Sequence, residues 1–132
     1  MSEDNEALAR RALATLADGD AEALIGLCDP EVECRPLIAG VEGGPYRGHE
    51  GIKRWFAELS SSFDERRPEI LSIEPLGDDT LVCELDLHLR GRGSGVEIDQ
   101  RVWGAARFRA GLVLWWGFFE TREEALTHLE AA

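Results

Sequence analysis

Residues 81–119 alternate between apolar and polar side chains, and this pattern constrains the fold more than any other part of the chain. From position 81 to 90, Leu or Cys occupies every odd position, while most even positions carry a charged side chain. A period of two is typical of a β-strand that buries one face. Glycine-containing reversals follow at 91–95 and at 110–111. The segment is therefore predicted to form three long antiparallel strands.

Charge pairing predicts how the first two of these strands align. One alignment brings three attractive pairs face to face at once: Arg90 with Glu97, His88 with Asp99, and Asp86 with Arg101. Opposite charges across neighbouring strands stabilise a sheet, whereas a shift of two residues would set Asp86 against Asp99. The first alignment is therefore expected.

This alignment gives the sheet two different faces. The face expected to point inward is apolar along all three strands except at Gln100. The outer face carries the charged pairs and then four large apolar residues: Trp103, Val113, Trp115 and Phe119. Because an exposed aromatic patch usually marks an interface, these four residues are expected to join two subunits in a homodimer.

The flanking segments are mostly helical. Helices are expected over 2–17, over 20–28, after Gly48 and over 121–131, short strands over 32–36 and 65–75, and a glycine-rich loop over 40–48. Pro68 lacks a backbone N–H, so it is expected either on an edge strand or at the start of the strand over 65–75. Helices that precede a run of antiparallel strands predict an α+β fold, with the helices covering one face of a curved sheet.

The length and the charge of the chain limit the number of domains and the kinds of partner that are expected. A chain of 132 residues predicts a single domain over 1–132. A net charge of −12 would repel nucleic acid and an anionic membrane surface, so neither is an expected partner. The first residues lack the pattern of a signal peptide, and no apolar run approaches the ~20 residues that span a bilayer. A cytoplasmic protein is therefore expected.

The cysteines and histidines do not suggest a cofactor or a metal. Cys28, Cys34 and Cys83 are odd in number and form no CxxC motif, which argues against a disulfide framework. The three histidines show neither HxH nor HExxH spacing. We therefore expect no metal site and no cofactor.

Four motifs spread along the chain point to a known family. They are ALATLADGDAEALIGLCDPEVECRP, GPYRGHEGIKRWFAEL, GRGSGVEI and ETREEAL. Together they resemble the SnoaL-like branch of the nuclear transport factor 2 superfamily over nearly the whole chain. The resemblance implies a cone-shaped, curved antiparallel sheet wrapped by three to four helices around an apolar pocket. It also implies a dimer that often forms through the outer sheet face.

The catalytic residues of the ketosteroid isomerases in this superfamily do not carry over to this chain. The resemblance places Ala12 and Ala106 where those enzymes hold an oxyanion with a tyrosine and an aspartate. It places Cys34 or Arg35 where they have an aspartate base. All three roles are therefore expected to be empty.

Several residues are candidates for a ligand-binding pocket, because binding cavities are mostly apolar with a few placed polar groups. They are Gln100, Tyr46, Cys34, Trp55, Phe56, Trp116 and Phe118. The Gln100 amide can both donate to and accept from a ligand. Alternatively, it is a core glutamine paired with a backbone group or a water. Trp55 and Phe56 also fit ordinary core packing, and Tyr46 is expected at the rim of the pocket.

The candidates for catalysis are His88, Asp99, Asp86 and Cys34. His88 and Asp99 would form an acid–base pair if the two sheet faces were exchanged, and otherwise they belong to a solvated row of charges. Cys34 would act as a nucleophile only with a lowered pKa, whereas a buried cysteine behaves as a small apolar residue.

Three functions are compatible with the sequence. The first is a protein that binds a compact hydrophobic molecule, with Gln100 as polar anchor and no cofactor. The second is a cofactor-independent isomerase, cyclase or hydrolase that uses a pocket carboxylate or histidine. The third is a dimeric interaction module whose cavity is filled by its own side chains.

Overall fold

The computed structural model describes residues 2–37 and 45–132. In chain order, its elements are α1 (Ser2–Asp18), α2 (Ala21–Ile25), β1 (Cys28–Arg35), β2 (Tyr46–Arg47), α3 (Gly48–Ser62), β3 (Phe63–Pro75), β4 (Thr80–Gly91), β5 (Glu97–Arg109), β6 (Leu112–Phe119) and α4 (Arg122–Ala131). Most of the loop predicted over 40–48 lies outside the described residues. None of the described helices is long and apolar enough to cross a bilayer.

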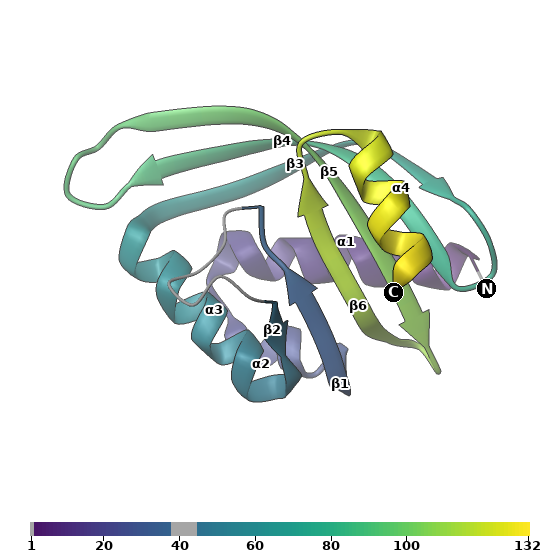
Figure 1. The fold of residues 1–132 in the computed structure, drawn as a ribbon. Helices are drawn as coiled ribbons and strands as arrows, with labels where there is room; N and C mark the ends of the chain where they lie inside the picture. Colours follow the sequence, from purple (N-terminus) through teal and green to yellow (C-terminus); the bar gives the residue numbers. More distant parts are fainter. Residues whose placement is uncertain (1, 38–44) are drawn as a thin grey trace.

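The six strands form one curved sheet in the order β2-β1-β6-β5-β4-β3 (Figure 1). α1, α2 and α3 contribute to the core on the concave face, and α4 packs on the opposite face. The α+β class is confirmed, and β3 lies at the edge, which is one of the two places expected for Pro68. β1 and β6 run parallel, which the sequence did not predict. Parallel neighbours need a long connection, and here every element from β2 to β5 lies between them.

The alignment of β4 with β5 is the one that charge pairing predicts. The observed pairs are Arg90 with Glu97, His88 with Asp99, and Asp86 with Arg101. The leucines of β4 therefore face the helices, and Leu85 is completely buried in the main core. On the other face, Arg101 Nε donates to Asp86 Oδ1 at 2.7 Å.

A β-bulge changes the faces of β6 near its start. The pairing of β5 with β6 shifts between Arg107 and Phe108. An extra residue in one strand reverses the side on which later side chains lie. Val113 therefore turns into the main core, where it is buried. The prediction that placed Val113 on the outer face is wrong for this reason.

α4 covers the outer aromatic residues of the sheet. Trp115 and Phe119 are buried and pack with Ala125 and Leu129 of α4, and Trp103 is partly buried against the same cluster. The sequence pattern does not show where the last helix docks, so these side chains were expected to be exposed. Their burial within one chain corrects that expectation and removes the reason for placing them between two subunits.

Local chemistry explains where several helices begin and end. The Asp20 carboxylate accepts a hydrogen bond from the Ala23 N–H at 3.0 Å, and the Thr121 hydroxyl accepts one from the Glu124 N–H at 3.1 Å. Both side chains are N-caps, which satisfy backbone N–H groups in the first turn of their helices. Gly19 follows α1 with φ of 68°, a conformation that favours glycine at the end of a helix.

β1 begins earlier than the sequence predicts. The strand starts at Cys28, where the sequence predicted the end of a helix, and continues through Pro30. A residue before proline avoids helical geometry. Cys28 instead pairs with Val113 of β6, and the ladder is irregular between Cys28 and Glu33.

The main core should be sensitive to the loss of Ile52, which has no exposed surface on α3. Ile52→Ala is expected to lower the free energy of unfolding by about 2–5 kcal/mol, because buried contacts are lost and a cavity remains. Urea unfolding measures this change. Leu76→Ala, at a residue that is 41% exposed, is the matched control and should change stability by less than about 0.5 kcal/mol. Equal effects of the two substitutions would contradict the described core.

The charged face should make stability depend on pH through His88. Its Nδ1 lies 2.5 Å from Asp99 Oδ1, and its Nε2 lies 3.1 Å from Glu69 Oε1. These hydrogen bonds raise the pKa of His88 above its ordinary value of 6.5. A raised pKa in the folded state gives stabilisation that is complete below about pH 6.5 and is lost as pH rises through the folded pKa.

We therefore expect the Tm difference between the unchanged protein and His88→Gln to be largest below pH 6.5. The difference should shrink at higher pH, as thermal unfolding followed by circular dichroism will show. A Tm difference that stays constant between about pH 5 and pH 9 would show that these hydrogen bonds do not stabilise the protonated ring.

The homodimer stays a prediction. Of the four residues predicted at its interface, only Trp103 still supports it, because its side chain is only partly buried. Size-exclusion chromatography with light scattering is expected to give twice the chain mass of 14.6 kDa at micromolar concentration. Trp103→Glu should halve that mass, because it places a charge on the outer sheet face. A single-chain mass for the unchanged protein would refute the dimer.

Candidate functional site

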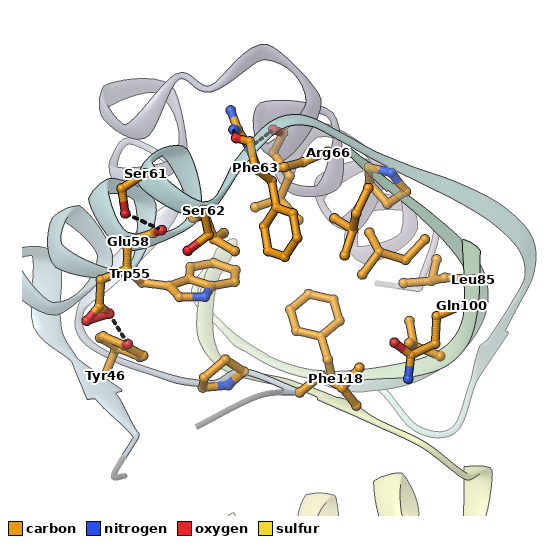
Figure 2. Close-up of a pocket in the computed structure, with 18 residues that line it drawn as sticks. Tyr46, Trp55, Glu58, Ser61, Ser62, Phe63, Arg66, Leu85, Gln100 and Phe118 are labelled. Atoms are coloured by element: carbon orange, nitrogen blue, oxygen red, sulfur yellow. Dashed lines mark hydrogen bonds between the residues drawn. The ribbon is translucent and has the colours of Figure 1, made fainter. Parts of the chain in front are cut away.

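A cavity of about 420 Å³ lies between α3 and the concave face of the sheet (Figure 2). Residues of α1, β2, α3, β3, β4, β5 and β6 contribute to its wall, together with two residues that follow β1. Small-molecule sites usually have volumes of roughly 300–1,000 Å³. The cavity is therefore large enough for a compact organic ligand.

Most of the cavity wall is apolar. Leu85, Leu87 and Leu89 line the sheet side, because alternate residues of β4 point to the concave face. Trp55 of α3 and Phe118 of β6 pack together with ring centroids 6.1 Å apart and line another part of the wall. This wall would bind the hydrophobic part of a ligand.

The tip of the β4–β5 hairpin holds the last turn of α3. The Arg92 backbone N–H donates to the Ser62 carbonyl at 2.9 Å, and Arg92 Nε donates to the Ser60 carbonyl at 2.7 Å. The last carbonyls of a helix have no partner within the helix and are often bound by arginine. These bonds fix the end of α3 beside the cavity.

Gln100 brings an amide to the sheet side of the cavity. It faces Leu87 across the β4–β5 ladder, and its side chain lies at the cavity wall (Figure 2). Within residues 2–37 and 45–132, the amide has no hydrogen-bonding partner from the protein. The structure therefore does not show the backbone partner that a core glutamine would need, and the amide is free to bind a ligand.

Tyr46 and Glu58 form a hydrogen-bonded pair in the wall, in which the Tyr46 hydroxyl donates to Glu58 Oε2. Tyr46 is buried, although the sequence predicted a place at the rim. Burial, followed by the hydrogen bond to Glu58, raises the pKa of Tyr46 to about 12. The hydroxyl therefore stays protonated and continues to donate. The Arg54 guanidinium lies over the Tyr46 ring, 4.9 Å from its centroid.

Arg66 lines the cavity, but its guanidinium donates hydrogen bonds to backbone carbonyls. Its Nη1 donates to the Phe63 carbonyl at 2.6 Å, and its Nε donates to the Leu16 carbonyl near the end of α1 at 3.3 Å. Its Nη2 lies beside Gly19, where an added Cβ would come within 2.9 Å. Burial lowers the pKa of Arg66, although a guanidinium remains charged in proteins.

The structure places some of the predicted ligand-binding residues at the cavity and others in the core. Gln100, Tyr46, Trp55 and Phe118 line the cavity. The other three are buried in the main core and are not part of the cavity wall: Cys34, Phe56 and Trp116. Burial also raises the pKa of the Cys34 thiol, which opposes the thiolate that a nucleophile requires.

The remaining catalytic candidates lie away from the cavity. His88, Asp86 and Asp99 are on the outer face, where His88 pairs with Asp99 and Asp86 with Arg101. Among the described residues, no group of three His, Cys, Asp or Glu side chains is placed to hold a metal ion.

Sequence reasoning missed Glu58, Arg66 and Phe63 as cavity residues. For Glu58 a signal was present, because it follows Trp55 by three positions and so shares its side of α3. Arg66 and Phe63 had no comparable signal, since their positions depend on the direction that the chain takes from the end of α3 into β3.

Solved structures with low sequence identity share the fold. A protein with ketosteroid isomerase-like fold from Catenulispora acidiphila, in complex with trimethylamine, is 14% identical, with 93% of this chain and 92% of that chain covered and a TM-score of 0.75. TerC co-crystallised with polyporic acid is 19% identical, with 98% and 99% covered and a TM-score of 0.76. RV0760c from Mycobacterium tuberculosis, in complex with estradiol-17beta-hemisuccinate, is 17% identical, with 91% and 95% covered and a TM-score of 0.76.

Sequence comparison identifies the family. No curated protein sequence matches the chain. The family model of the SnoaL-like domain matches residues 9–116, which is most of the chain. This match and the shared architecture confirm the resemblance seen in the motifs, and the chain therefore belongs to the SnoaL-like domain family.

Proposed function

We propose that the protein binds a compact, mostly hydrophobic small molecule in the cavity beneath α3, with Gln100 as a polar anchor and without a cofactor. The cavity volume of about 420 Å³ and the leucine and aromatic wall support this function. Burial of apolar ligand surface would supply most of the affinity, at roughly 25 cal/mol per Å² before the costs of binding.

The free amide of Gln100 is the observation that carries this proposal. Gln100 is half-buried, so its amide can bind water in the empty cavity, and a ligand that displaces this water must replace its hydrogen bonds. Gln100 lies on the wall of a cavity whose sheet side is otherwise apolar. A ligand carbonyl or hydroxyl at this position would therefore be favoured over a purely apolar group.

The two alternative functions have less support. An enzyme that uses His88, Asp86 or Asp99 would need these side chains in the cavity, and they lie on the opposite sheet face. The carboxylate that does line the cavity, Glu58, already accepts a hydrogen bond from Tyr46. An interaction module with a filled cavity does not fit the observed empty volume.

The proposal predicts saturable binding of 1-aminoanthracene, a neutral aromatic probe whose fluorescence rises in apolar surroundings. Leu87→Trp places a larger side chain in the cavity and is expected to weaken binding by at least about tenfold. Fluorescence titration measures both affinities.

His88→Trp is the matched control, because it adds the same ring to the opposite face of β4. Its affinity for the probe should remain close to that of the unchanged protein, and circular dichroism should show that both variants are folded. If the unchanged protein does not bind the probe saturably, or if the two variants lose affinity equally, the proposed function is refuted.

A further inference from the structure

The cavity has polar groups on two opposite sides. Figure 2 shows Gln100 on one side and the pair of Tyr46 and Glu58 on the other, with the rings of Trp55, Phe63 and Phe118 between them. A ligand that spans the cavity would therefore meet an amide at one end and a carboxylate at the other. Aromatic side chains would contact the apolar part between these ends.

Glu58 retains hydrogen-bonding capacity beyond its bond to Tyr46. The Tyr46 hydroxyl donates to Oε2, and no other described residue donates to Oε1. A carboxylate accepts several hydrogen bonds through its two oxygens, and it donates none. The Glu58 end of the cavity therefore suits a group that donates a hydrogen bond.

Among the described residues, the two arginines near this end, Arg66 and Arg54, make their contacts with the backbone and with the Tyr46 ring. Arg66 uses two nitrogens for the carbonyls of Leu16 and Phe63. Arg54 lies over the ring of Tyr46 and is exposed to solvent. The chain also carries a net charge of −12, which lowers the local concentration of anions and raises that of cations.

We propose that the cavity selects a ligand with two polar ends, one that hydrogen-bonds to the Gln100 amide and one that donates to the Glu58 carboxylate. The donating end is a hydroxyl or, with greater affinity, a protonated amine, and a carboxylate at this end is rejected. This inference rests on the proposed function and names the charge class of its ligand. Charge-assisted hydrogen bonds are roughly twice as strong as neutral ones, so an ammonium is preferred over a hydroxyl.

Four para-substituted biphenyls test this selectivity, because they differ only in the end group. The substituents are aminomethyl, hydroxymethyl, methoxymethyl and carboxylate. Isothermal titration calorimetry at pH 7 is expected to rank the aminomethyl compound tightest and the hydroxymethyl compound second. The methoxymethyl compound, which cannot donate, should bind about tenfold more weakly than the aminomethyl compound, and the carboxylate should bind weakest.

Glu58→Gln is the decisive variant, because it removes the charge and keeps an acceptor for the Tyr46 hydroxyl. It is expected to lower affinity for the aminomethyl compound about tenfold and to leave the methoxymethyl compound unchanged. Gln100→Leu is the matched control at the other end and should preserve the preference for the amine over the ether.

The outcomes separate this inference from the proposed function. If the carboxylate binds as tightly as the amine, or if Glu58→Gln keeps the full preference for the amine, the selectivity is refuted. In either case, displacement of 1-aminoanthracene by the methoxymethyl compound would still support a hydrophobic ligand site. If none of the four compounds displaces the probe, the selectivity and the assignment of the ligand to this cavity both fail.

Discussion

The cavity exists because α3 is held at a distance from the concave face of the sheet. Protein interiors are otherwise packed to the density of organic crystals, so an open volume persists only where rigid contacts surround it. Trp55 meets Trp116 edge-to-face at 5.5 Å, and Arg92 holds the last turn of α3. At the other end, Gly51 lies so close to Tyr46 that an added Cβ would come within 3.1 Å of its backbone. Both ends of α3 are therefore anchored, and the leucines of β4 are kept from closing the space.

Burial keeps the protons on the three cysteines and on Tyr46 near neutral pH. All three cysteines are buried, and burial raises their pKa values, to about 12 for Cys28 and about 11 for Cys83. Thiolates are therefore scarce near neutral pH. The raised pKa of Tyr46 likewise keeps its proton in place. Among the described residues, the polar contacts that remain for a ligand are hydrogen bonds, with Glu58 supplying a charge.

The sequence predicts a feature well where the feature depends on neighbouring residues or on pairs of strands. The alternation in β4 and the pairing of His88 with Asp99 follow from period and charge, and the structure confirms both. Val113 could not be placed, because a β-bulge depends on how the ladder fits at one point. The pair of Tyr46 and Glu58 forms between a short strand and a helix, and its geometry has no periodic signature. The fold was therefore predictable, while the hydrogen bond between Tyr46 and Glu58 was not.

The docking of α4 has a consequence for the behaviour of the protein in solution. This helix shields Trp115 and Phe119 through Ala125, Leu129 and His128, whose ring stacks on Phe119 with ring centroids 4.7 Å apart. Arg107 Nη2 also donates to the Leu129 carbonyl at 3.0 Å. A short helix of this kind can detach while the rest of the molecule stays folded. Detachment would expose the aromatic side chains of β6 and would favour aggregation. The docked α4 is therefore expected to protect the protein from aggregation.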